Sequence, residues 1–228
     1  MDKRVLITGG TGFVGHWLVK NHPIDESGNG WLLNIGSGDY NTFEWMNHQW
    51  DMIIHAAPID PCDVLNVAKR DNARVLYVSS GAVYHPENDT EYRQNKIRWE
   101  QECLDSGVDV VIARLFTFYG EKLDAGKAYS QFKKAAEAGE PLRIWGDGKT
   151  IRSYMHGSEM ARWMWAILLH GESGQAYDVG SDEPVTLKRL AFTLCGNSEV
   201  IIENSRPDPV PVYLPVDTAK TKKLLEKM

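Results

Sequence analysis

Cysteine is scarce in this sequence, which has three in 228 residues: Cys62, Cys103 and Cys195. They lie far apart and none belongs to a C-x-x-C pair, so the spacing predicts neither a disulfide framework nor a zinc site. Free cysteines of this kind are typical of a reducing compartment. We therefore expect a cytoplasmic protein that binds no metal.

Long hydrophobic runs and blocks of positive charge are also missing. No run approaches the roughly 18 residues that a membrane span requires, and the chain starts on a strand-like segment instead of a charged leader. The net charge is −6, and Lys and Arg form no block, which argues against nucleic acid as a partner. We expect neither a membrane nor a nucleic acid to bind, so local groups must hold any nucleotide phosphate.

Short hydrophobic runs, by contrast, recur along the first half of the chain. After the N-terminal RVLIT they cover residues 51–58, 73–80 and 109–116, and helical patterns such as DVLNVAKRDN and EYRQNKIRWEQECLDSG lie between them. Buried strands that alternate with helices indicate a parallel sheet covered on both faces. The sequence therefore predicts an α/β fold with a doubly wound, Rossmann-like parallel sheet.

A glycine-rich turn joins the first predicted strand to the first predicted helix. In TGGTGFVG, Gly9, Gly12 and Gly15 are spaced three apart. The first permits the tight turn, the second lets the backbone approach a pyrophosphate, and the third lets the helix pack closely on the strand. The N–H groups that open the helix, at Phe13 and Val14, then face the anion. This turn predicts a dinucleotide cofactor.

The residue that would distinguish NAD from NADP is not obvious. An acidic residue about 20 positions after the glycines normally accepts a hydrogen bond from the ribose 2′-hydroxyl. Here that region holds Asp25, Glu26 and Asp39, none at a clear strand end. Because no Arg lies between Arg4 and Arg70 to meet a 2′-phosphate, we favour NAD, and NADP stays open.

The character of the sequence changes after Gly120. Residues 128–146 read as a helix and an edge strand, residues 158–171 as a strongly apolar helix, and the tail from Asn197 is rich in proline. We expect residues 1–116, joined by the returning segment 158–182, to form the dinucleotide-binding portion. Residues 117–157 and 183–228 would form a small C-terminal substrate-binding lobe within one compact unit.

Several segments spread along the chain form a recognisable set. They are TGGTGFVG, HAA (55–57), SSGAVY (79–84), YRQNK (92–96), ARLFTFYG (113–120), WGDGKTIRSYMHGSEMAR (145–162) and YDVGSDEPVTLKRLA (177–191). Together they resemble the NAD-dependent epimerase/dehydratase family, extended members of the short-chain dehydrogenase/reductase superfamily that act on nucleotide-sugars. The resemblance implies an enzyme, and its motifs are specific for the superfamily but not for one reaction.

Tyr92 and Lys96 are the strongest candidates for chemistry, even without that resemblance. They lie four residues apart in a predicted helix and therefore share one face. A nearby ammonium favours the phenolate and lowers a pKa that is about 10 when unperturbed. Tyr92 can then act as general acid or base while hydride moves between a sugar carbon and the nicotinamide. By the resemblance, Ser80 would bind the same oxygen, which completes the catalytic set.

The resemblance also implies residues that bind the cofactor and the substrate. Arg152 would bind the substrate diphosphate, because a guanidinium fork suits paired phosphate oxygens, and Arg206 would add a second phosphate contact. Thr117 replaces the family's usual Asn and would contact the substrate. The implied cofactor-binding set is Gly9, Gly12, Phe13, Val14, Gly15, Asp39 near the adenine, Ala56, Ala57, Tyr92 and Lys96.

Three segments are shorter than the family pattern. Between Gly15 and Asp51 one strand–helix unit of the cofactor half is missing or reduced. Residues 57–76 hold one short helix where the family has a longer one that helps form a dimer, so a homodimer is less secure than the resemblance implies. The loop between Tyr84 and Tyr92, which in the family helps cover the sugar, has lost most of its length.

The residue types near Ser80 narrow the reaction. Dehydratases and decarboxylases of this superfamily carry an acidic residue two positions after the Ser/Thr, and here that position is Ala82. We therefore favour a 4-epimerase or 4-ketoreductase. The alternative is a nucleotide-sugar decarboxylase or 4,6-dehydratase that takes its carboxylate from Glu87 or Glu91. A second alternative is a non-catalytic dinucleotide-binding module.

Overall fold

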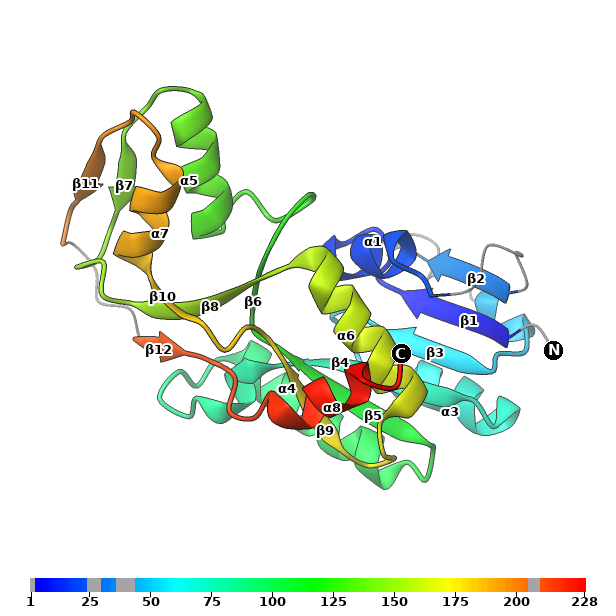
Figure 1. The fold of residues 1–228 in the computed structure, drawn as a ribbon. Coiled ribbons are helices and arrows are strands. Elements are labelled where there is room, and N and C mark those ends of the chain that lie inside the picture. Colours follow the sequence, from blue (N-terminus) through cyan, green and yellow to red (C-terminus); the bar gives the residue numbers. More distant parts are fainter. Residues whose placement is uncertain (1–2, 24–29, 36–43, 205–209) are drawn as a thin grey trace.

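The protein consists of a body built on a six-stranded sheet and a smaller lobe beside it (Figure 1). The structure is a computed structural model and describes residues 3–23, 30–35, 44–204 and 210–228. The six strands of the larger sheet are all parallel, in the order β2-β1-β3-β4-β5-β9. Their bounds are β1 Lys3–Thr8, β2 Gly30–Ile35, β3 Met52–His55, β4 Arg74–Ser80, β5 Val110–Leu115 and β9 Ala176–Val179.

Helices cover both faces of this sheet, as the sequence predicts. One face packs on α1 (Phe13–Lys20), α6 (Gly157–His170) and α8 (Ala219–Leu225), and the other on α3 (Cys62–Asp71) and α4 (Glu91–Asp105). The predicted doubly wound α/β fold is therefore confirmed.

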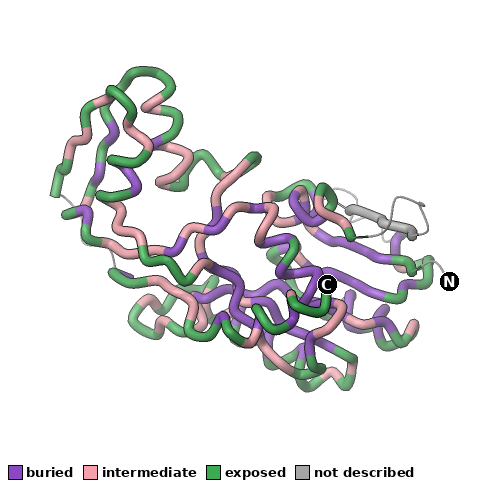
Figure 2. The backbone as a smooth tube through the Cα atoms, viewed as in Figure 1, coloured by how far each residue is buried: buried purple, intermediate pink, exposed green. Residues whose placement is uncertain are grey.

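The strand residues divide between the two cores because successive side chains of a strand point to opposite faces. In β1, Val5 and Ile7 enter the core shared with α1 and α6, whereas Leu6 enters the core shared with α3 and α4. Strands buried on both faces require hydrophobic residues at every position. This explains why these strands read as unbroken hydrophobic runs. Figure 2 shows buried backbone concentrated in this sheet and in α6.

The lobe has its own small core. It contains α5 (Ala128–Glu137), β7 (Leu142–Ile144), α7 (Leu187–Leu194) and β11 (Val200–Ile202), which pairs with β7 in parallel. The buried residues that hold these elements together are Phe132, Leu142, Ile144, Leu190 and Ala191.

A second sheet connects the lobe to the body. Its strands are β6 (Thr117–Tyr119), β8 (Ile151–His156), β10 (Pro184–Thr186) and β12 (Val212–Tyr213), and β8 pairs with all three others. β6 begins two residues after β5 ends, and α6 follows β8 directly. The connecting sheet therefore meets the carboxyl ends of the larger sheet's strands, where ligands bind in open α/β folds.

The C-terminal helix packs with the body. Leu224 of α8 is buried in the same core as α6 and α1, and Thr221 donates a hydrogen bond to the Asp178 carbonyl at the end of β9 (2.7 Å). The predicted division into dinucleotide-binding and substrate-binding parts stays a prediction. Within the segment 183–228 assigned to the substrate-binding lobe, α8 packs against the larger sheet instead.

In the described ranges of the chain, β2 is the edge strand beside β1, where a sheet of order 3-2-1-4-5-6 continues with a further strand. The strand–helix unit predicted to be missing or reduced before Asp51 stays a prediction. Among the described residues between β2 and β3, helical structure is limited to the short η1 (Glu44–Asn47). In the part of the chain that the structure describes, no helix is both long enough and apolar enough to span a bilayer.

Candidate active site

The glycine turn packs directly on the end of β3. A Cβ atom on Gly9, whose φ is +76°, would lie 2.6 Å from the backbone nitrogen of Ala57, so only glycine fits there. A Cβ on Gly15 would lie 2.2 Å from the Cα of Gly10. The turn, the start of α1 and the 56–57 backbone thus form one close-packed unit, as expected for the first and third glycines.

Gly12 differs from these two glycines because it is exposed and less crowded. It is the N-cap of α1 with an ordinary φ of −77°, and an added Cβ would meet only the Gly9 carbonyl oxygen, at 3.3 Å. No side chain caps α1, and its first turn holds no acidic residue. The first N–H groups of the helix, including those of Phe13 and Val14, are therefore left for an anion.

Two buried polar side chains beneath the turn hold this unit together. The Thr8 hydroxyl lies 2.8 Å from Nδ1 of His55, and the backbone N–H of Ala57 points at the same hydroxyl oxygen (3.4 Å). Nε2 of His55 lies 3.1 Å from the Ile59 carbonyl oxygen. Burial lowers the pKa of His55 to about 4, so the ring is neutral and donates from Nε2 while Nδ1 accepts from Thr8.

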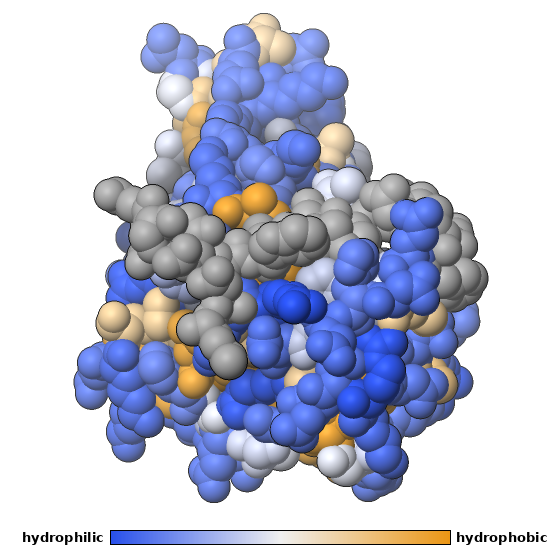
Figure 3. Space-filling view, turned by 90° about the vertical axis from the view of Figure 1, so that its right-hand side faces the viewer, coloured by the Kyte–Doolittle hydropathy of each residue, from blue (hydrophilic) through white to orange (hydrophobic). Residues whose placement is uncertain are grey.

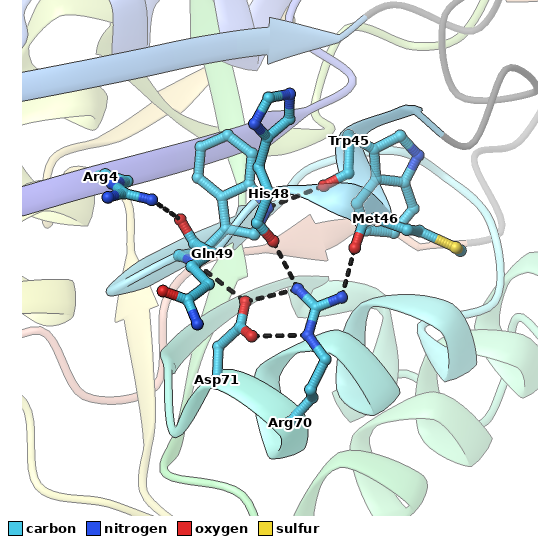
Figure 4. A network of polar contacts seen from close by, with 8 residues as sticks. Arg4, Trp45, Met46, His48, Gln49, Arg70 and Asp71 are labelled. Atoms are coloured by element: carbon cyan, nitrogen blue, oxygen red, sulfur yellow. Dashed lines mark hydrogen bonds and ion pairs between the residues drawn. The ribbon is translucent and has the colours of Figure 1, made fainter.

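The segment before β3 is held by a charged clamp on α3 (Figure 4). Arg70 donates to the carbonyl oxygens of Met46 and His48 and pairs with Asp71, whose other oxygen accepts from the Trp50 N–H at 3.0 Å. The clamp fixes the chain where it enters β3. Ala56 and Ala57 follow the other end of this strand. Asp39, predicted to lie near the adenine, falls outside the described residues.

Ser80 is the last residue of β4, and its hydroxyl faces two partners. The Ala82 N–H donates to Oγ at 3.2 Å, which begins the short η2 helix (Gly81–Tyr84). The hydroxyl of Tyr213, from β12, lies 3.1 Å from the same Oγ. Tyr213 is a site residue that the sequence reasoning missed, because nothing in its proline-rich surroundings signals it.

Lys96 lies inside the site while Tyr92 faces outward. Lys96 is 5% exposed, and its Nζ donates to the Val78 carbonyl oxygen at 2.8 Å and to the Tyr77 hydroxyl at 3.3 Å. Burial lowers the pKa of Lys96 to about 8, although the negative charge of Glu100 opposes the shift. Tyr92 is 52% exposed, and its ring centre lies 5.9 Å from Nζ. The helix face therefore brings the two side chains together as their spacing predicts.

A buried ionic network supports this end of the sheet. Both oxygens of Glu100, on α4, bind the Arg114 guanidinium (3.0 and 2.6 Å), and Ser79 donates to one of them at 2.5 Å. Arg114 also donates to the Tyr84 hydroxyl at 2.7 Å, which in turn donates to Asp178 at 3.1 Å. The network ties η2 to β5, α4 and β9. Arg114 lies in the ARLFTFYG segment, but its partners are set by the fold.

The predicted substrate residues lie on the connecting sheet. Arg152 of β8 is paired in register with Tyr213, and its guanidinium lies 5.7 Å from the Tyr213 ring centre. Thr117 begins β6, two residues after the end of β5, and is partly buried. Arg206 lies outside the described residues.

A cavity of about 350 Å³ opens on the lobe. One of the residues that line it is Trp145, which is half exposed and follows β7 in the WGDG segment. Another is Arg143, which donates a hydrogen bond to Glu203 at 2.8 Å. Its other lining residues are Gln131, Phe132, Ala135, Glu140 and Pro141.

Comparisons with known proteins agree with this geometry. The model of the NAD dependent epimerase/dehydratase family matches residues 44–180. UDP-glucuronic acid decarboxylase 4 of Arabidopsis thaliana is 28% identical over 97% of this chain, which spans 64% of that protein's length.

Two solved structures share the fold over 98% of the chain. An epimerase of Methanothermobacter thermautotrophicus is 20% identical with a TM-score of 0.81 over 86% of its own chain. A dTDP-glucose 4,6-dehydratase of Bacillus anthracis, solved in complex with NAD, is 17% identical with a TM-score of 0.77 over 90% of its chain. The three relatives have three different reactions, so likeness alone does not choose among them.

Proposed function

The chain belongs to the NAD dependent epimerase/dehydratase family, and on that premise we propose that it moves hydride to or from a sugar carbon of a nucleotide-sugar. The resemblance noted in the sequence is thus confirmed at the level of the family. The residues that carry out the reaction and the choice of reaction are argued below from the site.

The glycine unit supports dinucleotide binding. The exposed backbone at Gly12 and the uncapped start of α1 suit a pyrophosphate, and Ala56 and Ala57 lie where the nicotinamide half would pass. Small side chains at these two positions leave room for a flat ring against the strand end. We propose NAD as the cofactor, with NADP as the alternative.

One observation carries the catalytic proposal: a buried lysine whose hydrogen bonds go to neutral oxygens. An ammonium is expensive to bury without a paired carboxylate, and Lys96 bonds the Val78 carbonyl and the Tyr77 hydroxyl. A charge kept in this position is best explained by a function. The rings of Tyr77, Trp99 and Tyr92 lie 5.0, 5.6 and 5.9 Å from Nζ. Because Tyr92 is the exposed one of the three, we propose that Lys96 serves its phenol.

The chain's own residues then handle the proton. Tyr92, which shares a helix face with the Lys96 ammonium, takes the proton from the sugar hydroxyl or returns it to the ketone. Ser80 binds the same oxygen and holds it beside the phenol. When bound, the nicotinamide supplies the acceptor or donor of the hydride. The exposed position of Tyr92 leaves it open to a sugar held by the lobe.

The substrate would lie between the connecting sheet and the lobe. We propose that Arg152 binds the diphosphate, that Arg206 adds a second contact, and that Thr117 contacts the sugar. Trp145 and the lobe cavity suit the nucleobase, because an exposed indole offers a face for stacking.

The reaction that the site favours is 4-epimerisation or reduction of a 4-ketone. Ala82 provides no carboxylate beside Ser80, so loss of water lacks the acid that the resemblance implies at this position. Glu87 is exposed and bound to His85 at 2.9 Å, and Glu91 is exposed at the start of α4. Both therefore lie in positions where water screens them.

Decarboxylation is the second candidate because of the relatives. The 28% identity to a UDP-glucuronic acid decarboxylase extends over 97% of the chain. A carboxylate at C5 of a 4-keto sugar leaves without an added acid once the ketone has formed, so the chemistry needs only oxidation at C4 and a later proton donor.

The assembly and compartment stay predictions. The helix predicted to help form a homodimer, in residues 57–76, is α3, and we propose that the exposed face of α4, where Ile97 and Leu104 are 40% and 43% exposed, also takes part. The face seen in Figure 3 is mostly hydrophilic over its described residues and shows only small hydrophobic patches, so it offers no comparable surface. The cytoplasmic location rests on the sequence alone.

The first test is to identify the nucleotide released from denatured, freshly purified protein and then to incubate native protein with nucleotide-sugars. Retained stoichiometric NAD supports a redox-neutral cycle, hence an epimerase or a decarboxylase. Product analysis with UDP-glucuronic acid then separates the two by release of carbon dioxide. Consumption of added NADH or NADPH with a keto-sugar supports a reductase.

Tyr92→Phe tests the catalytic role. We expect turnover to fall by about 10²–10⁴-fold, with dinucleotide binding and thermal stability unchanged because the side chain is half exposed. Unchanged turnover would sink the proposal for Tyr92. A wild-type protein that holds no dinucleotide and converts no sugar would favour the non-catalytic module.

A further inference from the structure

The Tyr213 hydroxyl reaches Ser80 from the far end of the chain. The two residues are 133 positions apart, yet their hydroxyl oxygens lie 3.1 Å from each other. The Tyr213 hydroxyl is also 3.4 Å from the Leu115 carbonyl oxygen, at the end of β5. The phenol therefore stands where the strand ends of β4 and β5 meet the connecting sheet.

The ring is held firmly enough to fix the position of its hydroxyl. β12 pairs with β8 so that Tyr213 lies opposite Arg152, whose guanidinium is 5.7 Å from the ring centre. The rings of His85 and Phe116 each lie 5.1 Å away on the body side. Because these contacts come from both the body and the connecting sheet, the position of the hydroxyl depends on how the two pack together.

The phenol is a hydrogen-bond donor at neutral pH. Burial raises the pKa of Tyr213 to about 12, and the nearby polar groups of Ser80 and Ala82 offset this only in part. The remaining question is which hydroxyl gives its proton. The 3.4 Å contact to Leu115 is long for an O–H···O bond, whereas the 3.1 Å contact to Ser80 is closer to the usual range.

This geometry sets the direction of the Ser80 proton. Oγ of Ser80 already accepts from the Ala82 N–H at 3.2 Å. If Tyr213 donates as well, both acceptor positions of Oγ are filled and its own proton is free to point away from the two donors. A sugar oxygen beside Ser80 would then receive that proton as a hydrogen bond.

We propose that Tyr213 is a positioning residue that turns the Ser80 hydroxyl into a hydrogen-bond donor toward the reacting sugar oxygen. The inference rests on the proposed function and adds a residue to the same site. A donor at this oxygen stabilises the negative charge that develops as a ketone is reduced, and by reversal the same contact assists oxidation. The Ala82 N–H and the Tyr213 hydroxyl thus both donate to Ser80 and polarise its hydroxyl. This polarisation does not require an acidic side chain at position 82.

The test compares Tyr213→Phe with a matched control, Tyr154→Phe. Tyr154 lies on the neighbouring strand β8, packs against the lobe core, and has a pKa raised to about 12 by burial, as Tyr213 has. We expect kcat of Tyr213→Phe to fall roughly 10- to 100-fold with KM within about twofold, and Tyr154→Phe to behave as wild type. Equal kcat in Tyr213→Phe and wild type would overturn the proposal.

A double-mutant cycle shows whether Tyr213 acts through Ser80. In a Ser80→Ala background, Tyr213→Phe should have no further effect on kcat. An equal fold-loss in both backgrounds would show that the phenol acts on its own or only by packing, and would overturn the positioning role.

A readout without substrate keeps this inference separate from the proposed function. The unfolding midpoints of Ser80→Ala, Tyr213→Phe and the double variant should be non-additive if the two hydroxyls share a hydrogen bond. Additive midpoints overturn the inference whatever the protein catalyses. Non-additive midpoints in a protein that converts no nucleotide-sugar would keep the Ser80–Tyr213 bond and overturn the proposed function.

Discussion

The Nζ atom of Lys96 lies 5.9 Å from the centre of the Tyr92 ring, although Lys96 is buried and Tyr92 is half exposed. One turn of α4 separates the two side chains, so the helix can keep the ammonium inside the protein while the phenol meets a ligand. The bonds to Val78 and Tyr77 hold the ammonium at the end of β4. This arrangement buries a charge without a paired carboxylate, at a cost in stability.

The first prediction concerns Lys96→Met. The folded pKa of about 8 is below the value of 10.5 for a free lysine, so the folded state releases its proton first. Below pH 8 both states hold the proton, and the contribution of Lys96 to the free energy of unfolding is at its lowest. Between pH 8 and 10.5 only the unfolded state holds the proton, so this contribution rises. The full linkage is on the order of 3 kcal/mol. We expect the methionine variant to lack this rise and to be at least as stable as wild type at pH 7, with strongly reduced turnover.

Urea unfolding of both proteins at pH 7, 8.5 and 10 measures this difference. Methionine matches the length of the lysine stem, so packing should be retained. Parallel curves for the two proteins across the pH range would contradict the buried-ammonium account. A variant with wild-type turnover would contradict the role of the charge.

The second prediction concerns Gly12→Ala. The backbone of Gly12 suits alanine, and the new Cβ would meet only the Gly9 carbonyl oxygen at 3.3 Å. The methyl group would instead project where a pyrophosphate approaches. We expect the melting temperature to stay within a few degrees and dinucleotide affinity to fall at least about tenfold, or 1.4 kcal/mol, by calorimetry.

Gly107→Ala and Gly9→Ala bracket this result. Gly107 has a φ of +73°, close to the +76° of Gly9, but its added Cβ would meet nothing within 4 Å. Gly107→Ala should therefore lose about 1 kcal/mol of stability and no affinity, whereas Gly9→Ala should lose much more stability because of the Ala57 backbone. If Gly12→Ala binds the dinucleotide with wild-type affinity, the pyrophosphate does not bind at this turn.

Local spacing predicted those parts of the site that depend on local structure. The glycine turn and the Tyr92–Lys96 pair lie within one turn–helix unit or one helix, so their geometry follows from backbone rules. The contact between Ser80 and Tyr213 spans 133 residues and depends on the pairing of β12 with β8. No spacing rule reaches that far, so no sequence pattern indicates this contact.

The burial of charged residues was also beyond sequence reasoning. Glu100 looks like an ordinary surface residue of a helix, but it is 6% exposed because α4 packs against β4 and β5. Its partner Arg114 lies in a strand that is otherwise hydrophobic. The arginine within a hydrophobic strand pattern was the sequence feature that could have predicted a buried partner of opposite charge. It could not have predicted that this partner is Glu100.

The third prediction concerns that pair. Arg114→Met leaves the Glu100 carboxylate buried with only Ser79 as a donor, which should lower the unfolding free energy by about 3–5 kcal/mol. Adding Glu100→Leu should recover most of the loss because no buried charge remains. Chemical denaturation of the single and double variants measures both effects.

Arg98→Met is the matched control for Arg114→Met. Arg98 lies 3.5 Å from Glu102 on the exposed side of the same helix, and both side chains are largely solvated. Its loss should change stability by less than about 0.5 kcal/mol. Similar losses in Arg98→Met and Arg114→Met would show that burial does not strengthen the Glu100 pair.

The fourth prediction is an acid-dependent loss of stability through His55. Its folded pKa of about 4 is below the ordinary 6.5, because burial disfavours the charged ring. Above pH 6.5 both the folded and unfolded states hold a neutral ring, so the contribution to stability is complete. As the pH falls from 6.5 toward 4, only the unfolded state gains the proton, and the loss should reach roughly 3 kcal/mol.

Unfolding of wild type and His55→Gln at pH 7.5 and pH 4.5 isolates this effect. The glutamine amide can still donate to the Ile59 carbonyl but does not titrate, so the variant should be weaker at pH 7.5 and lose less on acidification. Because His55 braces Thr8 beneath the glycine turn, saturating dinucleotide should protect wild type at pH 4.5 by favouring the folded state. Equal acid losses in the two proteins would place the titrating group elsewhere and leave His55 with a packing role alone.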